Sequence, residues 1–340
     1  MIRAGIVGLG RWGRALVNAV AGKSGNTSDD IRFMRAATRT RGSAEEFCRE
    51  RQIVLADSYD EILCAPDIDA VVLATPHSQH EAQALAAIAA GKHVFVEKPL
   101  TLDLNSALVV ADAARKAGLV LAVGFTRRFH PSVAELRLRA RDGRLGSIVA
   151  MVAQHTTSTV QFIAPDNWRA SAEEAPGGAF TAVGVHSLDN MIEFAGRVRD
   201  LRCVTARNYP GPSDDTTTVM LRFDGGATGL IFCSVATATN FELTTYGTKG
   251  LVEISRTDLS RFRFAPTATA APTGAVPAPP NEILQFPGFD MLHAEMTAFA
   301  RAIRDGTPYP VPIADVLHGM AVFDAVVESA KRGEIIAIRN

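Results

Sequence analysis

A glycine-rich hexapeptide between a predicted strand and a predicted helix constrains the fold of this chain more than any other feature. Ile2 to Val7 is mostly apolar, as expected for a buried strand, and Arg14 to Ala21 has a helical pattern. Between them, Gly8-Leu9-Gly10-Arg11-Trp12-Gly13 fits G-x-G-x-x-G. Glycines at this spacing allow a tight turn and let a pyrophosphate approach backbone N–H groups at the helix N-terminus. The hexapeptide predicts a dinucleotide site, although the glycines alone would indicate only a turn.

Strands and helices continue to alternate after this hexapeptide, which predicts a doubly wound parallel sheet. The expected strands are Ile31 to Ala37, Asp69 to Ala74, His93 to Val96 and Val120 to Val123. The expected helices are Ser43 to Gln52, Tyr59 to Cys64, Glu81 to Ala90 and Leu104 to Lys116. The polar segment Gly22 to Asp30 is expected to be an exposed loop. We expect this nucleotide-binding Rossmann domain to span residues 1–124.

The end of the second strand bears on the choice of cofactor. A fold that prefers NAD usually has an acid there to hold the ribose 2′-hydroxyl. This chain has Thr38 at that position and Arg39 beside it. Because a hydroxyl and a guanidinium suit a 2′-phosphate, NADP is favoured over NAD. The alternative is that Arg39 is only a solvated arginine, like others nearby.

Two further loops follow strands of the same predicted sheet, where ligand sites of such sheets lie. One is Thr75-Pro76-His77-Ser78-Gln79-His80, and the other is Glu97-Lys98-Pro99. We place Thr75, Pro76, His80, Glu97 and Lys98 beside the cofactor, with packing as the alternative for His80. Lysine is readily desolvated and suits proton handling, so Lys98 is a candidate catalytic residue rather than only part of a turn.

Composition narrows the class of protein and its partners. The chain has 340 residues, enough for two domains. Its net charge of −1 lacks the excess of positive charge that would favour binding to nucleic acid or to an anionic membrane. The four cysteines include no C-x-x-C pair, which fits reduced thiols and argues against a zinc site. The N-terminus lacks a signal-peptide pattern, and no apolar run is long enough to span a bilayer. We expect a cytoplasmic protein without a bound metal.

The chain resembles the Gfo/Idh/MocA oxidoreductase family, named for glucose–fructose oxidoreductase and inositol dehydrogenase. The resemblance rests on the glycine hexapeptide and on four further stretches: Thr75 to His80, Ala90 to Leu100, Gly124-Phe125-Thr126-Arg127-Arg128-Phe129-His130-Pro131, and Trp168-Arg169. It implies a Rossmann domain followed by an α+β domain with a large, mostly antiparallel sheet. It also implies oxidation or reduction of a secondary alcohol on a sugar, polyol or related molecule, and a cis peptide bond between Lys98 and Pro99.

The second half of the chain is expected to form this antiparallel sheet, within a domain spanning residues 125–340. The predicted strands begin near Ile148 and include Leu201 to Val204, Thr216 to Phe223, Ala227 to Ser234, Phe241 to Tyr246 and Leu251 to Ile254. Met291 to Arg304 and Ile313 to Lys331 are predicted helices that could pack back on the first domain. Phe264 to Asn281 is expected to be a low-complexity loop. The uncovered face of the sheet is a candidate subunit interface, giving a homodimer or homotetramer.

His186 is the second candidate catalytic residue. It lies in Gly177 to Asp189, a glycine-bearing stretch leading into a predicted helix, and it fits the family's G-G-x(5)-G-x-H-x-x-D pattern. A histidine there can exchange a proton with a substrate hydroxyl. Many relatives carry an acid four residues earlier, where this chain has Ala182. Either Lys98 and His186 suffice, or Thr181 or another polar group substitutes, or catalysis has been lost.

The remaining candidates would contact substrate. His155 ends a predicted strand, Trp168 and Arg169 stand in an irregular segment, and Asp189 lies three residues after His186. Packing is the alternative for Trp168, and helix capping or packing is the alternative for Asp189. Arg127 and Arg128 could contact cofactor or substrate, or be ordinary surface arginines.

These observations predict an NAD(P)-dependent dehydrogenase or reductase acting on a small sugar, polyol or cyclic diol. In the predicted reaction Lys98 binds the reacting oxygen and His186 relays the proton. The main alternative is a cofactor-binding regulator or scaffold without turnover, which the alanine at position 182 would favour. Another is elimination or hydrolysis in which the nicotinamide is regenerated within each cycle.

Overall fold

The computed structural model describes residues 1–22, 28–164, 167–211, 213–271 and 274–338. The chain forms two compact units. The first contains residues 1–126 and 290–320, and the second contains residues 127–289 and 321–340. The chain therefore passes between the units three times. Residues 23–27 of the expected loop at Gly22 to Asp30 lie outside the described residues.

The first unit is built on a six-stranded parallel sheet with the order β3-β2-β1-β4-β5-β6. Its strands are β1 (Ile2–Val7), β2 (Ile31–Ala37), β3 (Val54–Leu55), β4 (Ala70–Leu73), β5 (His93–Val96) and β6 (Leu121–Val123). Strand β4 is buried along its whole length, as expected for the centre of a parallel sheet covered on both faces. Strand order reverses between β1 and β4, so a crevice for a ligand is expected at their carboxyl ends.

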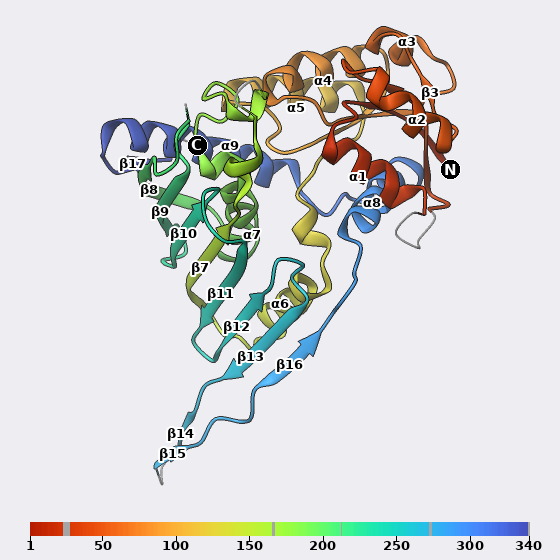
Figure 1. The fold of residues 1–340 in the computed structure, drawn as a ribbon. Helices are drawn as coiled ribbons and strands as arrows, with labels where there is room; N and C mark the ends of the chain where they lie inside the picture. Colours follow the sequence, from red (N-terminus) through yellow and green to blue (C-terminus); the bar gives the residue numbers. More distant parts are fainter. Residues whose placement is uncertain (23–27, 165–166, 212, 272–273, 339–340) are drawn as a thin grey trace. The chain divides into compact units, whose positions relative to one another are not determined.

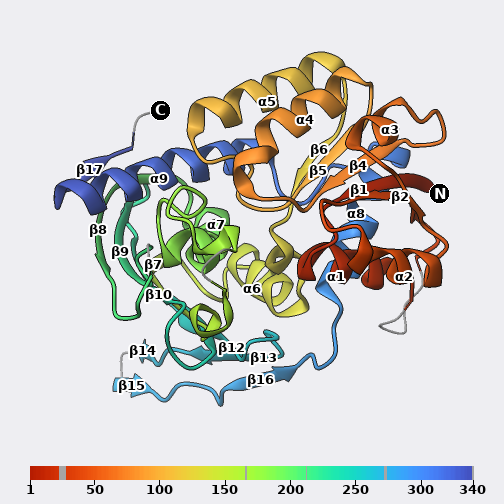
Figure 2. The ribbon, with the colours of Figure 1, turned by 45° about the horizontal axis from the view of Figure 1, so that its top comes forward.

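Helices cover both faces of this sheet. They are α1 (Arg11–Val20), α2 (Gly42–Glu50), α3 (Tyr59–Cys64), α4 (His80–Ala89), α5 (Leu104–Ala117) and α8 (Met291–Asp305). Figure 2 shows α4 and α5 side by side over one face, with α1 and α2 across the other. The predicted doubly wound sheet is confirmed.

Helix α8 completes the core of the first unit although it lies far along the chain. It packs against α1, β1 and β2. Its Met296, Phe299 and Ala300 belong to the same buried cluster as residues of the sheet. The Phe299 ring meets the Phe95 ring edge-on, with 5.7 Å between the ring centroids. Both ends of α8 carry specific signals: the Asp290 carboxylate accepts the His293 N–H at 2.9 Å, and Gly306 follows with a φ of +66°.

The second unit is built on a nine-stranded sheet with the order β16-β13-β12-β11-β7-β10-β9-β8-β17. Its strands are β7 (Ile148–Thr156), β8 (Val198–Ala206), β9 (Thr216–Phe223), β10 (Thr228–Ser234), β11 (Asn240–Gly247), β12 (Gly250–Ser255), β13 (Arg261–Pro266), β16 (Glu282–Gln285) and β17 (Ile336–Ala337). Strand β10 pairs with β7 in parallel, and the other neighbours in the described sheet are antiparallel. The predicted large, mostly antiparallel sheet is confirmed (Figure 1).

Helices α6 (Pro131–Arg141) and α7 (Val185–Ala195) belong to the second unit, and α7 packs on β7 and β10. A π-helical turn over Phe180–Gly184 leads into α7. Helix α9 (Ile313–Arg332) begins in the first unit and ends in the second. No described helix is both long enough and apolar enough to cross a membrane.

The prediction that Phe264 to Asn281 forms a loop was wrong in part. Strand β13 continues to Pro266, and β14 (Thr269–Ala271) pairs with β15 (Gly274–Val276) as a small two-stranded sheet. Residues 272 and 273 between them lie outside the described residues. Alanine- and threonine-rich composition indicated low complexity, but strand pairing uses backbone groups that nearly every residue supplies, so β14 and β15 pair nonetheless.

Candidate active site

The glycine hexapeptide forms a turn in which two of its glycines are sterically required. Gly8 has a φ of +95°, and a Cβ added there would lie 2.5 Å from the Ala74 carbonyl oxygen. A Cβ on Gly13 would lie 1.9 Å from the Gly8 carbonyl oxygen. In contrast, a Cβ on Gly10 would have no atom within 4 Å. Gly8 and Gly13 therefore let the turn close against the sheet, whereas the backbone at Gly10 is open to a ligand.

The N-terminus of α1 suits the pyrophosphate of a dinucleotide. Gly10 caps the helix without a side-chain hydrogen bond, and no acidic residue lies in the first turn. Backbone N–H groups and the helix dipole therefore favour an anion there. Arg11 is exposed, and Trp12 is half-buried. The Trp12 Nε1–H is buried without a hydrogen-bond partner in the described part of the chain. These residues fit a bound dinucleotide.

Arg39, at the end of β2, differs from the arginines around it. Arg35 pairs with Asp67, and Arg41 pairs with Asp57. Arg39 is exposed beside the half-buried Thr38 and makes no ion pair or hydrogen bond within the described ranges. Its guanidinium is thus available for a ligand at the edge where the ribose of a dinucleotide would lie.

His80 joins two of the loops that the sequence predicted to lie together. Its ring is completely buried, with Nδ1 2.9 Å from the Pro99 carbonyl oxygen and Nε2 3.1 Å from the Thr75 carbonyl oxygen. The loops that follow β4 and β5 are therefore held by one side chain. Thr75 is also fixed, because its hydroxyl donates to the Gln83 side-chain oxygen at 2.6 Å. Within the first unit, His80 accordingly serves to position the loop that carries Lys98.

The Glu97-Lys98-Pro99 loop follows β5 directly. Glu97 is buried, Lys98 is half-buried, and the peptide bond between Lys98 and Pro99 is cis, as predicted. A Cβ added to Gly124 would lie 3.1 Å from either carboxylate oxygen of Glu97, so the chain after β6 packs closely on that carboxylate. Because β1, β4 and β5 are neighbours in a parallel sheet, the Lys98 loop and the glycine turn lie at the same edge.

In the second unit, the π-helical turn carries Ala182 and leads directly into His186. π-Helical turns are rare overall, and many of those that do occur lie at functional sites. Ala182 is exposed, whereas His186 is partly buried in the first turn of α7. The completely buried Thr181 hydroxyl accepts the Gly177 N–H at 3.0 Å. That bond fixes the start of the turn and uses one of the two acceptor positions of the hydroxyl that was one candidate substitute for the missing acid.

His155 on β7 lies beside His186, with 6.5 Å between the ring centroids. Its Nδ1 is 3.1 Å from the Val183 carbonyl oxygen and 3.1 Å from the Arg127 Nη2. The sequence prediction placed both histidines near substrate, and the structure brings the two rings together within one unit.

Arg127 and Arg128 are both buried but have different surroundings. The Arg128 guanidinium donates to both carboxylate oxygens of Asp189, at 2.7 and 2.8 Å. The Arg127 guanidinium instead stacks on the Phe241 ring, with its Cζ 3.8 Å from the ring centroid, and lies 3.1 Å from the His155 ring nitrogens. The alternative that these are surface arginines is wrong, since they are 7% and 4% exposed.

Trp168 and Arg169 lie together in a short 3-10 turn. The Arg169 Cζ is 4.1 Å from the centroid of the Trp168 ring, and the Trp168 side chain is only partly buried. Of the predicted site residues, those from Gly8 to Lys98 belong to the first unit, whereas His155, Trp168, Arg169, His186 and Asp189 belong to the second.

Sequence reasoning missed the contrast between Arg127 and Arg128 and the role of Phe241. Phe241 is 114 positions from Arg127 along the chain, on β11, and reaches the site because β11 pairs with β7 so that Phe241 faces His155. The predicted strand from Phe241 to Tyr246 could have indicated a buried Phe241, but not its partner.

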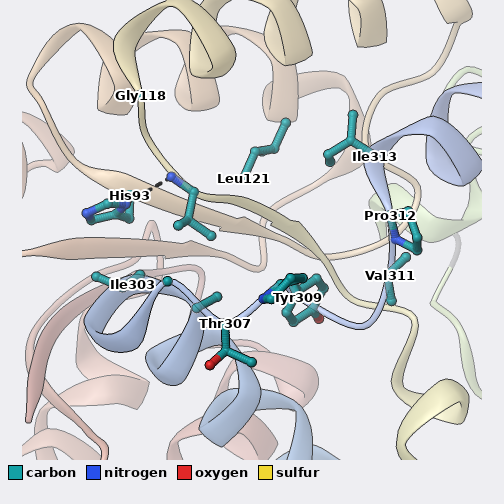
Figure 3. Close-up of a pocket in the computed structure, with 13 residues that line it drawn as sticks. His93, Gly118, Leu121, Ile303, Thr307, Tyr309, Val311, Pro312 and Ile313 are labelled. Atoms are coloured by element: carbon teal, nitrogen blue, oxygen red, sulfur yellow. Dashed lines mark hydrogen bonds between the residues drawn. The ribbon is translucent and has the colours of Figure 1, made fainter.

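A pocket of about 510 Å³ in the first unit contains none of the predicted site residues. It lies beside β6 and is lined by His93, Val120, Tyr309, Pro312 and neighbouring residues (Figure 3). His93 starts β5, so this end of the pocket is at the opposite edge of the sheet from Lys98. The His93 Nδ1 accepts the Val120 N–H at 2.9 Å, and burial lowers the pKa of this histidine.

The fold and these motifs define a two-unit protein with a dinucleotide-binding Rossmann domain. Residues 2–125 match the model of an oxidoreductase family with an NAD-binding Rossmann fold, and residues 133–253 match the C-terminal domain of GFO/IDH/MocA proteins. The chain belongs to the Gfo/Idh/MocA family.

Known relatives include dehydrogenases. The trans-1,2-dihydrobenzene-1,2-diol dehydrogenase of Oryctolagus cuniculus is 30% identical over 220 residues, which cover 64% of this chain and 65% of that protein. The scyllo-inositol 2-dehydrogenase (NAD(+)) of Bacillus subtilis (strain 168) is 29% identical over 245 residues, covering 67% of this chain and 66% of the relative. The match thus spans slightly less than two thirds of each of these relatives.

Solved structures share the fold over the whole chain. A levoglucosan dehydrogenase in complex with NADH and L-sorbose has a TM-score of 0.87 at 22% identity, with coverage of 100% of this chain and 99% of the other. An oxidoreductase domain protein from Kribbella flavida has a TM-score of 0.87 at 23% identity and covers 100% of both chains.

Proposed function

We propose that this protein is an NAD(P)-dependent dehydrogenase or reductase that acts on a secondary alcohol or ketone of a sugar, polyol or cyclic diol. The observation that carries the proposal is the loop anchored by His80, which presents Lys98 at the same sheet edge as the glycine turn. The names of the relatives, which include a diol dehydrogenase and an inositol dehydrogenase, support this class of substrate.

In this proposal the cofactor is held by residues of the first unit. Gly8, Gly10, Arg11, Trp12 and Gly13 receive the pyrophosphate at the N-terminus of α1. The loops that contain Thr75, Pro76 and Glu97 border the nicotinamide half. The bound nicotinamide supplies the chemistry of accepting or donating a hydride.

Two side chains handle the proton and the oxygen of the substrate. The Lys98 ammonium donates a hydrogen bond to the reacting oxygen and lowers the pKa of that hydroxyl, since a nearby cation favours the alkoxide. The His186 imidazole takes the hydroxyl proton in oxidation and returns it in reduction. His155, Trp168 and Arg169 contact the remainder of the substrate. Asp189 orients the helix that carries His186 through its salt bridge with Arg128.

Removal of the lysine tests this assignment directly. We expect Lys98→Ala to lower kcat by about 10²–10⁴-fold, the range typical of losing a general acid–base or charge-stabilising group. Because Lys98 lies outside the glycine turn, cofactor affinity should change little. The measurement is cofactor absorbance with a panel of sugars, polyols and cyclic diols, together with calorimetric titration of the cofactor. A variant that retains most of its kcat would remove Lys98 from the mechanism.

The cofactor preference in this proposal is for NADP over NAD. Arg39 is an available cation, and Thr38 places a hydroxyl where an acid would repel a 2′-phosphate. The ratio of the two dissociation constants tests the preference, and Arg39→Gln should bring that ratio toward one. Tighter NAD binding by the unchanged chain would contradict it.

The second candidate is a cofactor-binding regulator without turnover, and the exposed alanine at position 182 favours it. If restoring a carboxylate with Ala182→Asp creates activity in a chain that binds cofactor but shows none, the regulator is supported. If the unchanged chain turns over any member of the panel, the regulator is excluded. Activity without net change in cofactor absorbance would instead indicate elimination or hydrolysis with internal regeneration of the nicotinamide.

The proposed assembly is a homodimer or homotetramer through the face of the nine-stranded sheet that α7 does not cover. Met220 and Leu230 are cross-strand neighbours on that face and are 63% and 36% exposed. Val204 and Tyr246 are exposed on the same face at 62% and 41%. Exposed apolar residues gathered on a sheet face are typical of an interface. Light scattering on the purified chain gives the subunit count, and a monomer would contradict the proposal.

A further inference from the structure

The Arg127 guanidinium is a buried cation with an unused donor. The residue is 7% exposed, and its Nη1 is buried without a hydrogen-bond partner in the ranges that the structure describes. Its other contacts are the face of the Phe241 ring and the ring nitrogens of His155. An unsatisfied buried donor is costly, and its retention calls for an explanation.

No carboxylate among the described residues neutralises this charge. Two carboxylates of α7 in the same unit bind other arginines: Asp189 binds Arg128, and Glu193 binds Arg137 at 2.5 Å. Burial without a compensating anion lowers the pKa of Arg127 to about 9, which leaves the group charged at neutral pH. The positive charge is therefore uncompensated by the described residues of the second unit.

Arg139 provides an internal comparison, because it is also a buried arginine stacked on phenylalanine. Its Cζ lies 4.6 Å from the Phe262 ring centroid, and its side chain is 3% exposed. Unlike Arg127, it forms salt bridges with two carboxylates, those of Glu135 and Glu282. Two carboxylates thus pair with one stacked arginine, whereas no carboxylate in the described ranges pairs with the other.

His155 does not compensate for the charge either. Both of its ring nitrogens lie 3.1 Å from the Arg127 Nη2, and an imidazole carries no negative charge in any protonation state found near neutral pH. His155 lies beside Arg127, the His186 ring lies 6.5 Å from the His155 ring between centroids, and both histidines are partly exposed. A ligand group placed against them would feel a cation that water screens little.

We propose that Arg127, together with His155 and His186, recognises an anionic group of the substrate, most simply a carboxylate, so that polyhydroxy acids are preferred to neutral sugars. This inference rests on the proposed function and narrows its substrate class. The same charge could attract the anionic oxygens of the cofactor, and the two sources are separated by the experiment below.

The experiment compares carboxylates with neutral molecules of matched shape. The pairs are D-glucuronate with D-glucose, D-galacturonate with D-galactose, and D-gluconate with D-glucitol. Binding to the chain loaded with NADPH, the reduced form of the cofactor that the proposal favours, is measured by calorimetry, and turnover is measured with NADP. We expect at least one carboxylate to bind about 10-fold or more tightly than its neutral partner, the range for one hydrogen bond to a charged group. If no carboxylate exceeds its partner, the proposal is overturned.

Variants locate the effect at Arg127. Arg127→Met should abolish the preference for the carboxylate and raise the melting temperature of the unliganded chain, because an uncompensated buried charge is removed. Arg127→Lys should keep the preference in reduced form. Arg139→Lys serves as the matched control and should leave the preference unchanged. A preference that survives in Arg127→Met overturns the proposal, as does an unliganded melting temperature that falls in that variant as far as in Arg139→Met.

Cofactor titrations separate the remaining alternatives. If Arg127→Met weakens NADH or NADPH binding about 10-fold and leaves the ratio between carboxylate and neutral ligand unchanged, the anion belongs to the cofactor and the substrate proposal fails. Selective binding of a carboxylate without turnover of any compound supports the anion site while contradicting the proposed enzyme. Turnover of neutral sugars in preference to acids contradicts the anion site while leaving the enzyme intact.

Discussion

The two units build their parts of the candidate site from different materials. In the first unit the site is largely backbone: glycines that must lack a Cβ, helix N–H groups, and carbonyl oxygens held by His80. In the second unit it is side chains: neighbouring arginines, two histidines and the carboxylate of Asp189. A backbone site depends on local geometry, whereas a side-chain site depends on partners brought from distant strands and helices.

The largest loss in the free energy of unfolding is expected when one buried charge of the second unit loses its partner. Asp189→Ala removes the carboxylate that binds the buried Arg128 guanidinium at two points and leaves it the more distant Glu193 carboxylate, at 3.8 Å, which should cost about 3–5 kcal/mol in the free energy of unfolding. Chemical denaturation measures the loss. The control is Asp112→Ala on α5, where an exposed carboxylate pairs with Arg115 and Lys116 and removal should cost less than about 1 kcal/mol. Equal losses would show that burial does not distinguish the two pairs.

The backbone character of the first unit is tested at two glycines. Gly13→Ala forces a Cβ against the Gly8 carbonyl and should destabilise the fold by about 1–3 kcal/mol, because backbone atoms must move. Gly10→Ala meets no atom, so it should preserve stability within about 1 kcal/mol. We expect Gly10→Ala to weaken cofactor binding nonetheless, since the added methyl enters the open side of the turn. Unchanged cofactor affinity in that variant would argue against the assigned pyrophosphate position.

The smallest effect concerns pH and involves His130 at the start of α6. Its ring is completely buried, Nδ1 accepts the Ser132 N–H, and burial lowers the pKa to about 4. The unfolded chain, with a histidine pKa of about 6.5, binds a proton that the folded chain excludes. Stability should therefore fall as pH decreases from about 6.5 toward 4, by about 1.4 kcal/mol per unit at most.

His130→Asn is the matched variant for this effect, because asparagine retains a side-chain cap but does not titrate in that range. Denaturation curves at pH 7 and pH 5 measure the difference between the two chains. The stability advantage of the unchanged chain should shrink at the lower pH by about 1–2 kcal/mol. A constant difference would mean that His130 does not take part in the acid sensitivity.

The difference between a backbone site in the first unit and a side-chain site in the second explains which features could be predicted from the sequence. The turn has no room for a Cβ at Gly8 or Gly13, so glycine is required at both positions and can be recognised in the sequence. The motif therefore predicted the turn and the parallel sheet. His80 anchoring the Lys98 loop could be inferred only as packing, because its acceptors are carbonyl groups that any residue would supply.

In the second unit, the sequence indicated the antiparallel strands through their alternating pattern and left the identity of side-chain partners undetermined. Arg127 and Arg128 are consecutive and chemically identical, yet only Arg128 meets a carboxylate, 61 positions away. The π-helical turn before His186 has no pattern of apolar residues that separates it from an ordinary helix start. Such features depend on the register of strands and helices, which is settled by the whole core.

The long-range packing of α8 has a consequence for the order in which the chain is made. The ribosome delivers residues 1–126 early, but Met296, Phe299 and Ala300, which fill the same core, emerge only after strands β7 to β16 have been synthesised. At typical rates of about 5–20 residues per second, that interval is on the order of ten to thirty seconds. During it the apolar surface that α8 will cover, including the ring of Phe95, has no lasting partner, so nascent chains of this protein should be natural clients of cellular chaperones.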